Sequence, residues 1–424
     1  MQAITNTYIK YIDLVALENW SVQGLLDAKF NYSNKYEQAR IGDFLIKSRK
    51  VVNIEDDKVY SRVTVKINNN GVILRDTETG VNIGTKKQYL AKAGQFIISK
   101  IDARNGAFGI IPNELDNAIV TNDFPLFDVN KKKINPQFLL LITTTKVFIK
   151  FAQSCSSGTT NRQRMDIDMF LNQKIPLPKL EEQNKIVKNY LDKVTEAERL
   201  NNEADNLESE IEKYLTKKLG IENIKNKKPI GIYLIDLYEM TRWDIWNKST
   251  QLNNSGMRIV PLRNVIKMKS GNFLPASKME KGEYNVYGGN GKNGMHNSFT
   301  YEGKRLVIGR VGEYCGNVHL VDGKYWITDN AFVVDKISNE VSYEFLAVVL
   351  KQLNLNKYRV LSAQPSISQS SILSLEMPLP TEKIQKEIVE RITKEKKAID
   401  KIRGLNISIK IEAQKQFESV IFNS

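Results

Sequence analysis

Two stretches of the sequence are rich in side chains that bind nucleic acids. "SCSSGTTNRQR" (154–164) and "SAQPSISQS" (362–370) combine hydroxyl, amide and arginine side chains over about ten residues each. These groups contact the phosphates and base edges of DNA in protein–DNA interfaces. An ordinary polar connector has a similar composition, so the two stretches alone leave both interpretations open.

The sequence contains no complete set of residues for catalysis or for metal binding. The two histidines, His296 and His319, have no cysteine or carboxylate neighbours at metal-ligand spacing. "GGNGKNG" (288–294) lacks the first glycine of a phosphate-binding loop, and Asn293 follows the lysine where such a loop has Ser or Thr. We therefore predict a flexible, hydrogen-bonding loop there. We predict that this chain is not an enzyme and binds no metal.

The charge balance favours a polyanionic partner. The chain has 62 basic and 48 acidic residues, a net charge of +14 and an isoelectric point near 9.4. Nucleic acid is the commonest partner of such a surface, although a lysine-rich proteome produces the same excess. The sequence has only two cysteines, Cys155 and Cys315, and it contains neither a signal-peptide pattern nor a long apolar run. These three features favour a cytoplasmic protein.

The most informative feature is an internal repeat. "IPLPKLEEQNKIV" (175–187) and "MPLPTEKIQKEIV" (377–389) share the pattern PLP, four residues, Gln, two residues, IV. Four further pairs keep the same order: 41–47 with 262–268, 95–110 with 305–320, 120–129 with 327–336, and 134–142 with 341–349. The offset falls from 221 to 202 along the chain, as expected of two diverged copies with small deletions.

Each copy begins with a β-rich part followed by a short helix. Short β-branched or aromatic runs separated by Gly and Asn predict strands at 59–67, 95–99, 106–111, 304–311 and 323–328. Asn135 with Pro136 behind it, and Ser342 in the second copy, are typical N-terminal caps of the helix that follows.

A long helix is predicted after each PLP segment. Residues 180–219 contain no Gly or Pro, and residues 382–421 contain only Gly404 as a weak helix former. Apolar residues recur at steps of three and four in both, and Leu405 belongs to the second stripe. Each helix spans about 60 Å at 1.5 Å per residue. Because neither stripe can stay exposed, we expect the two helices to pack on each other.

Together these features resemble the specificity subunits of type I restriction–modification systems. The segments that carry the resemblance are 157–187, 283–294, 305–334 and 377–389. "LLDAKF" (25–30) and "RWDIW" (242–246) also resemble the entry segment of each recognition domain in that family. The first copy departs from the common pattern, because it has no "VYGGNG" loop and carries "TTNRQR" in place of "SAQPSIS".

The resemblance implies an architecture and a function. The expected fold is α+β: two β-rich target recognition domains, each followed by a long helix, with an antiparallel coiled coil of the two helices and a pseudo-twofold repeat. The chain would bind a bipartite double-stranded DNA target and fix the spacing of its halves. It would dock two adenine-methylating modification subunits and, through them, restriction subunits. S-adenosylmethionine, ATP and Mg are expected on those partners, and no cofactor on this chain.

The expected domain boundaries follow the repeat. They are 1–176 for the first recognition domain, 177–220 for the central helix, 221–255 for a linker, 256–377 for the second recognition domain and 378–424 for the final helix.

Position and chemistry also select candidate residues. Those for DNA contact are Lys100, Arg104, Thr160, Arg162, Arg164, Lys269, Asn290, Lys292, Arg310 and Ser366. We call the two places where a β-rich domain meets the long helix after it the joints. The candidate spacer or partner-docking residues at the joints are Pro176, Pro178, Gln183, Pro378, Pro380 and Gln385. The alternative from another functional class is a non-enzymatic coiled-coil scaffold whose β-rich modules bind proteins. DNA binding with and without a methyltransferase subunit distinguishes the two.

Overall fold

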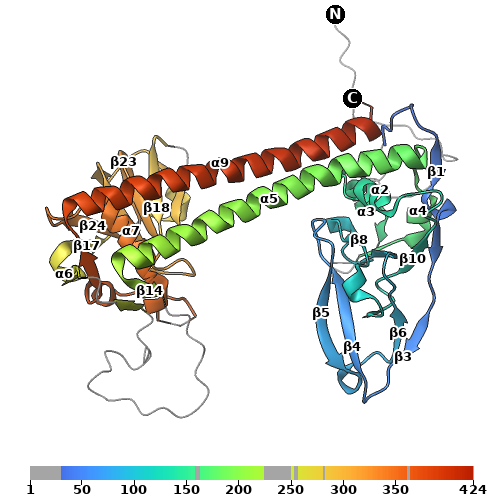
Figure 1. Ribbon diagram of the computed structural model, residues 1–424, viewed down its shortest axis with the longest axis horizontal. Helices are drawn as coiled ribbons and strands as arrows, with labels where there is room; N and C mark the ends of the chain where they lie inside the picture. Colours follow the sequence, from blue (N-terminus) through green and yellow to red (C-terminus); the bar gives the residue numbers. More distant parts are fainter. Residues whose placement is uncertain are drawn as a thin grey trace, which may run out of the picture. The chain divides into compact units, whose positions relative to one another are not determined.

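The chain forms two compact units, shown in Figure 1. Our computed structural model describes residues 30–157, 163–223, 250–252, 256–279, 282–360 and 363–423. Unit 1 comprises Met1–Glu198 and Asn406–Ser424, and unit 2 comprises Arg199–Leu405. Each unit therefore contains one β-rich part and a portion of each long helix. The segment "RWDIW" and residues 25–29 of "LLDAKF" lie outside the described residues.

Unit 1 contains a five-stranded sheet of order β3-β6-β9-β4-β5 and a four-stranded sheet of order β2-β10-β7-β8. Two further strand pairs, β1-β13 and β11-β12, lie outside these sheets. The strands are β1 (Gln38–Arg40), β2 (Leu45–Lys47), β3 (Val51–Asn53), β4 (Val59–Val65), β5 (Val72–Thr79), β6 (Lys87–Leu90), β7 (Phe96–Ile98), β8 (Phe108–Ile110), β9 (Ile119–Val120), β10 (Leu126–Val129), β11 (Ser156–Ser157), β12 (Arg164–Met165) and β13 (Lys174–Pro176).

The predicted helix of the first copy is divided in two. The helices of this region are α2 (Pro136–Thr143), α3 (Lys146–Ser154) and α4 (Ile167–Asn172). Asn135 caps α2 as expected, since its side chain accepts a hydrogen bond from the backbone of Gln137. The break occurs because Thr145 caps a new helix and accepts from the backbone N–H of Phe148. A hydroxyl that bonds nearby backbone competes with helix continuation.

Unit 2 contains two four-stranded sheets, β17-β24-β21-β22 and β19-β18-β23-β20, and the pairs β16-β25 and β14-β15. The strands are β14 (Ile221–Asn223), β15 (Thr250–Leu252), β16 (Arg258–Pro261), β17 (Ile266–Ser270), β18 (Tyr284–Gly288), β19 (Gly291–His296), β20 (Tyr301–Glu302), β21 (Arg305–Gly309), β22 (Val318–Val321), β23 (Lys324–Ile327), β24 (Ala331–Ile337) and β25 (Glu376–Leu379). The short helices are α6 (Leu262–Val265), α7 (Tyr343–Leu353) and α8 (Gln369–Leu373).

The sheet topology confirms the repeat. The sheet β2-β10-β7-β8 of unit 1 and the sheet β17-β24-β21-β22 of unit 2 have the same strand order, and they contain the sequence pairs predicted to match. The pair β1-β13 corresponds in the same way to β16-β25. Ser342 caps α7 through the backbone N–H of Phe345, at the position that Asn135 occupies in the first copy.

The segment "GGNGKNG" is more ordered than the loop that we predicted. It forms the end of a β-hairpin, in which β18 and β19 pair antiparallel up to Gly288 and Gly291. Gly291 has a φ of +90°, a conformation that glycine adopts without the steric cost of a Cβ. The prediction of a flexible loop was wrong because a two-residue turn between paired strands has the same composition as a loop.

The two long helices end where the sequence predicts. They are α5 (Leu180–Leu219) and α9 (Glu382–Ile421), coloured green and red in Figure 1. In unit 1 the first half of α5 packs with the last half of α9, and Lys193 pairs with Glu412 at 2.8 Å. In unit 2 the last half of α5 packs with the first half of α9, and Lys218 pairs with Glu387 at 3.2 Å. This antiparallel packing confirms the predicted helix pair.

One position of the apolar stripe differs from the prediction. Leu405 is 50% exposed, whereas Asn406 is 7% exposed and donates a hydrogen bond to the backbone carbonyl of Ala197. Asn406 lies seven residues from the buried residues Ile399 and Ala413, so a regular helix brings Asn406, and not Leu405, onto the buried face. Gly404 lies inside the continuous helix α9. The described part of the chain contains no helix that is long and apolar enough to cross a membrane.

The core of unit 1 is built around an aromatic cluster. Phe170 of α4 is fully buried, and its ring centroid lies 6.0–6.4 Å from those of four other phenylalanines. These neighbours are Phe96, Phe108, Phe127 and Phe148. Since Phe96, Phe108 and Phe127 belong to β7, β8 and β10, the cluster holds α4 and the segment before it against the four-stranded sheet.

Candidate nucleic-acid interface

In unit 2, three segments distant in sequence meet at Arg310. The backbone N–H of Arg310 donates to the carbonyl of Asn330 at 2.9 Å, and its own carbonyl accepts from Ile367 at 2.9 Å. Gly312 donates to the carbonyl of Pro365 at 2.7 Å, and Ser366 forms a bridge with Val311. The structure therefore brings the predicted residues Arg310 and Ser366 together. It also adds Asn330 to this place.

The turn of the β18–β19 hairpin reaches the same place. A side chain at Gly309 would put its Cβ 2.4 Å from the carbonyl oxygen of Gly289, so only glycine allows this approach. Asn290 follows in the turn, and Lys292 lies exposed at the start of β19. A hollow of about 230 Å³ opens here. It is lined by Gly289, Asn290, Asn293, Val311, Tyr314, Asn330 and Gln364.

Most side chains that line the hollow are polar, and none carries a formal charge. Its four amide side chains and one phenol can both donate and accept hydrogen bonds. Asn and Gln pair with the N6 and N7 atoms of adenine in the major groove. The chemistry of the lining therefore suits base edges better than phosphates.

The Arg310 side chain is partly fixed within the unit. Its guanidinium lies 5.7 Å from the centroid of the Phe332 ring, and Nη1 donates to the carbonyl of Asp329 at 3.4 Å. The remaining donors of an exposed guanidinium suit a phosphate or a base edge. Arg310 thus has a defined direction in a polar surface.

Unit 1 repeats this arrangement with different side chains. The backbone N–H of Lys100 donates to the carbonyl of Asp123 at 2.9 Å, and its carbonyl accepts from Met165 at 2.9 Å. These two hydrogen bonds match those of Arg310 in atoms and lengths. Lys100 therefore corresponds to Arg310, Asp123 to Asn330, and Arg164 to Ser366. We call these two sets of residues the reading positions: residues 100, 123 and 164 in unit 1, and residues 310, 330 and 366 in unit 2.

Electrostatics differ between the two sets of reading positions. Arg164 binds Asp123 through Nε–Oδ1 and Nη2–Oδ2 at 2.9 and 3.2 Å. These hydrogen bonds lower the pKa of Asp123, although partial burial acts in the opposite direction. Partial burial lowers the pKa of Lys100, and the charge of Asp123 opposes that shift. Unit 2 has the neutral residues Asn330 and Ser366 in place of this ion pair.

The other predicted DNA-contact residues fall into three groups. Arg104 lies near the unit 1 positions, since its Nη1 donates to Gln163 at 3.0 Å. Thr160 and Arg162 lie outside the described residues. Lys269 is on β17, where it pairs with Asp335 at 3.3 Å, and no hydrogen bond or ion pair among the described residues links it to Arg310. DNA contact by each of these residues stays a prediction.

Sequence reasoning missed Asp123, Asn330, Tyr314 and Gln364. The alignment of 120–129 with 327–336 already places Asp123 opposite Asn330, and this was the available indication. Neither residue stands in a stretch rich in DNA-binding side chains. Their nearness to residues 164 and 366 comes from hydrogen bonding between segments about 40 residues apart, which a local pattern does not reveal.

The glutamines of the repeated pattern are buried at the two joints. The Gln183 side chain accepts from the backbone of Asn135 at 2.8 Å and donates to the carbonyls of Lys133 and Pro178 at 3.1 and 2.8 Å. Gln385 accepts from the backbone of Ser342 at 3.4 Å. Its amide donates to the carbonyls of Glu340 and Pro380, at 2.7 and 3.0 Å. Each glutamine thus ties a long helix to the start of the short helix of its own copy.

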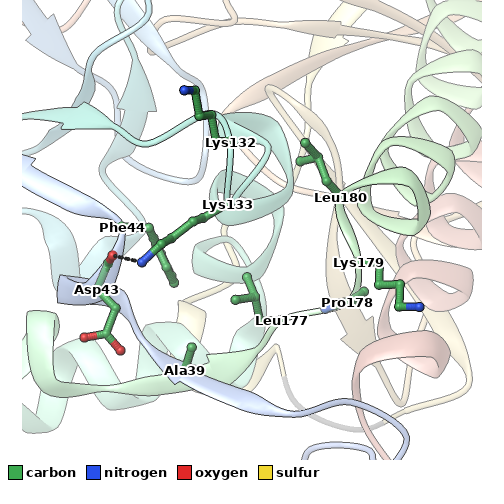
Figure 2. A pocket seen from close by; sticks show the side chains of 9 residues that line it. All are labelled: Ala39, Asp43, Phe44, Lys132, Lys133, Leu177, Pro178, Lys179 and Leu180. Atoms are coloured by element: carbon green, nitrogen blue, oxygen red, sulfur yellow. Dashed lines mark hydrogen bonds between the residues drawn. The ribbon is translucent and has the colours of Figure 1, made fainter.

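The prolines of the joints continue strands or line hollows. Pro176 and Pro378 pair with Gln38 and Ile259 in the strand pairs β1-β13 and β16-β25. Pro178 lines a hollow of about 560 Å³ in unit 1, where Lys133 Nζ reaches the carbonyl of Asp43 at 3.4 Å (Figure 2). The full lining is Ala39, Asp43, Phe44, Lys132, Lys133, Leu177, Pro178, Lys179 and Leu180.

The second joint has its own hollow. Pro380 and Gln385 line a space of about 710 Å³ in unit 2, together with Arg258, Glu340 and other residues. The first hollow has three lysines and one aspartate, whereas the second mixes acidic and basic groups. No group of three or more His, Cys, Asp or Glu side chains suited to a metal ion occurs in the described residues.

The chain is similar in sequence to known proteins. The family model of the type I restriction modification DNA specificity domain matches residues 33–213 and 254–412. The type I restriction enzyme EcoprrI specificity subunit of Escherichia coli is 31% identical over 125 residues, which is 28% of this chain and 31% of that protein. The chain thus spans about a third of the length of this curated relative.

Two solved structures resemble the fold over nearly their whole length. One, described as the structural basis underlying complex assembly and conformational transition of the type I R-M system, has a TM-score of 0.57 and 16% identity. The match covers 92% of this chain and 98% of that one. The type I restriction–modification S subunit from M. genitalium has a TM-score of 0.52 and 14% identity, with coverage of 94% and 98%.

Proposed function

The chain belongs to the type I restriction modification DNA specificity family, and from this premise we propose that it binds a DNA target made of two half-sites. Each unit reads one half-site through its set of reading positions. The two packed helices connect the units and keep the half-sites at a constant spacing. The chain itself carries out no reaction.

The observation that carries this proposal is the duplicated site. Lys100 and Arg310 make the same two backbone hydrogen bonds in their units, yet the side chains at the neighbouring positions differ. A common backbone with different donors and acceptors is what two readers of different base sequences require. The net charge of +14 supplies attraction to the phosphates, which positions the units but does not encode sequence.

We extend the proposal to partners at the joints. Two modification subunits, which methylate adenine with S-adenosylmethionine, dock at the hollows beside Pro178 and Pro380, and restriction subunits that use ATP and Mg join through them. The repeat supports this arrangement, since similar joints suit two copies of one partner. Gln183 and Gln385 are 0% and 3% exposed, so their contribution is to shape the joint from within.

An arginine substitution in the unit 2 site tests the proposal. We expect Arg310→Ala to weaken DNA binding by the complex with modification subunits and to reduce the salt dependence. Loss of one phosphate contact lowers the slope of log K against log salt by about 0.9. Fluorescence anisotropy with labelled duplex DNA over a range of salt concentrations measures both quantities. Arg310→Lys, which keeps the charge, is expected to retain most of the slope.

Arg391→Ala is the matched control. Arg391 belongs to the same unit and its side chain is 49% exposed, but it lies on α9 and pairs with Glu395 at 2.8 Å. Its replacement is expected to leave affinity and slope unchanged. If Arg310→Ala behaves like Arg391→Ala, the assignment of Arg310 to the DNA interface is wrong. If the wild-type complex does not bind DNA at all, the proposed function is wrong.

A further inference from the structure

The ion pair between Arg164 and Asp123 has a particular orientation. Arg164 uses Nε and Nη2, one edge of its guanidinium, to bind both carboxylate oxygens at 2.9 and 3.2 Å. The other edge, formed by Nη1 and the second N–H of Nη2, points away from Asp123 because the guanidinium is planar. Among the described residues, Nη1 has no hydrogen-bond partner.

The backbone holds both members of the pair. Arg164 lies in β12, which pairs with β11, and the next residue, Met165, donates its N–H to the carbonyl of Lys100 at 2.9 Å. The carbonyl of Asp123 accepts from the N–H of Lys100 at 2.9 Å. Lys100 therefore links the two segments. The Arg164 side chain is 50% exposed, so its free edge can reach a ligand.

The free edge matches one base. Guanine presents two acceptors, O6 and N7, on its major-groove edge, and two parallel N–H groups of an arginine bind them together. Adenine presents a donor beside its N7, so the same arginine edge meets one favourable and one unfavourable group. We propose that Arg164 reads a guanine in the half-site bound by unit 1, with Asp123 as the positioning residue. This inference rests on the proposed function.

A phosphate is the less suitable ligand for this arginine. The Asp123 carboxylate offsets the charge of Arg164, and charge is what a phosphate contact depends on. The hydrogen bonds from Arg164 lower the pKa of Asp123, so its carboxylate stays ionised near neutral pH. The ion pair therefore holds the Arg164 guanidinium in a fixed direction, and it weakens the electrostatic attraction of Arg164 to a phosphate. This combination favours base discrimination over affinity.

The matching positions of unit 2 carry no such pair. Asn330 and Ser366 replace Asp123 and Arg164, and amide groups line the hollow beside them. We therefore expect the guanine contact in one half-site only. The two half-sites differ because the same backbone positions present an arginine in one unit and short neutral side chains in the other.

The test uses the chain in complex with its modification subunits. A pool of randomised duplex DNA is bound, and the retained DNA is sequenced for wild type and variants. We expect one guanine position of one half-site to lose about 5- to 150-fold of its preference in Arg164→Lys, which keeps the charge but cannot form two parallel bonds. The other positions of both half-sites are expected to keep their preference.

Asp123→Ala separates positioning from a general structural role. We expect it to reduce the preference for guanine at the same position, while binding to DNA of random sequence is unchanged or stronger, because a negative charge is removed. Arg62→Lys is the matched control. Arg62 binds Asp76 with the same edge, at 2.6 and 2.8 Å, but within the strand pair β4-β5. It is expected to leave every base preference unchanged.

Several outcomes would overturn the inference. They are a wild-type site without a fixed guanine, an unchanged preference in Arg164→Lys, and an equal loss at all positions. A change at the same guanine in Arg62→Lys would also overturn it. A wild-type complex with no base preference would instead show that the proposed function itself is wrong.

Discussion

Replacing Phe170 with alanine is expected to lower the free energy of unfolding of unit 1 by about 3–5 kcal/mol. Phe170 is fully buried and contacts four other phenylalanine rings, so the substitution leaves a cavity that the neighbouring sheet cannot fill by a small shift. Because α4 begins two residues after β12, loss of this anchor also releases the segment that carries Arg164.

Hydrogen–deuterium exchange over a denaturant series measures this effect in unit 1 separately from unit 2. Peptides from β7, β8 and β10 report on the sheet next to Phe170. Phe273→Ala is the control, since Phe273 is 74% exposed and its replacement is expected to change stability by less than about 0.5 kcal/mol. A loss below 1 kcal/mol in Phe170→Ala would show that the aromatic cluster does not hold the domain as described.

The second large effect is expected for Gln183→Leu, at about 2–4 kcal/mol. Leucine occupies a similar volume, so packing changes little, but three backbone groups lose their hydrogen-bond partner. These groups are the N–H of Asn135 and the carbonyls of Lys133 and Pro178. A buried polar group without a partner costs about 1–3 kcal/mol, and water can reach some of these groups at the edge of the joint.

The exchange rate of one amide gives a local measurement of the same change. The N–H of Asn135 donates to Gln183, so we expect its exchange to accelerate strongly in Gln183→Leu. Gln416→Leu on the exposed face of α9 is the control, because within the described residues the side chain of Gln416 bonds only Glu412 of its own helix, at 2.8 Å. If the Asn135 amide stays protected and stability is unchanged, the glutamine does not join helix and domain.

Some of the architecture could be read from the sequence because it depends on local patterns. The long helices α5 and α9 have the bounds that the absence of proline and the preceding PLP segments predict. Asn135 and Ser342 are caps because a short polar side chain before an apolar helix satisfies the first free N–H groups. The strand order repeats because the sequence repeats.

Other features depend on contacts that the local pattern does not determine. Thr145 starts a second helix where the sequence predicts a single helix behind the cap Asn135. Asn406 is buried in place of Leu405, since the helix angle, and not hydrophobicity, decides which residue faces the partner helix. Gln183 is a polar residue of a helix surface by composition, but the adjacent loop surrounds it with three backbone partners.

The candidate site was predictable in composition but not in arrangement. Arg164, Lys100 and Arg310 were selected because of their charge and their place in the repeat. The carboxylate that orients Arg164 stands 41 positions away, and the hydrogen bonds of Lys100 help to bring the two segments together. The specificity proposed for each unit therefore depends on tertiary contacts.

The most direct test of the account is the sequence preference of the complex on randomised duplex DNA. Two reading units on one chain predict two short blocks of fixed bases, separated by bases without preference at a constant length. A single continuous block, or the absence of any preference, would contradict the proposal that the two units read separate half-sites.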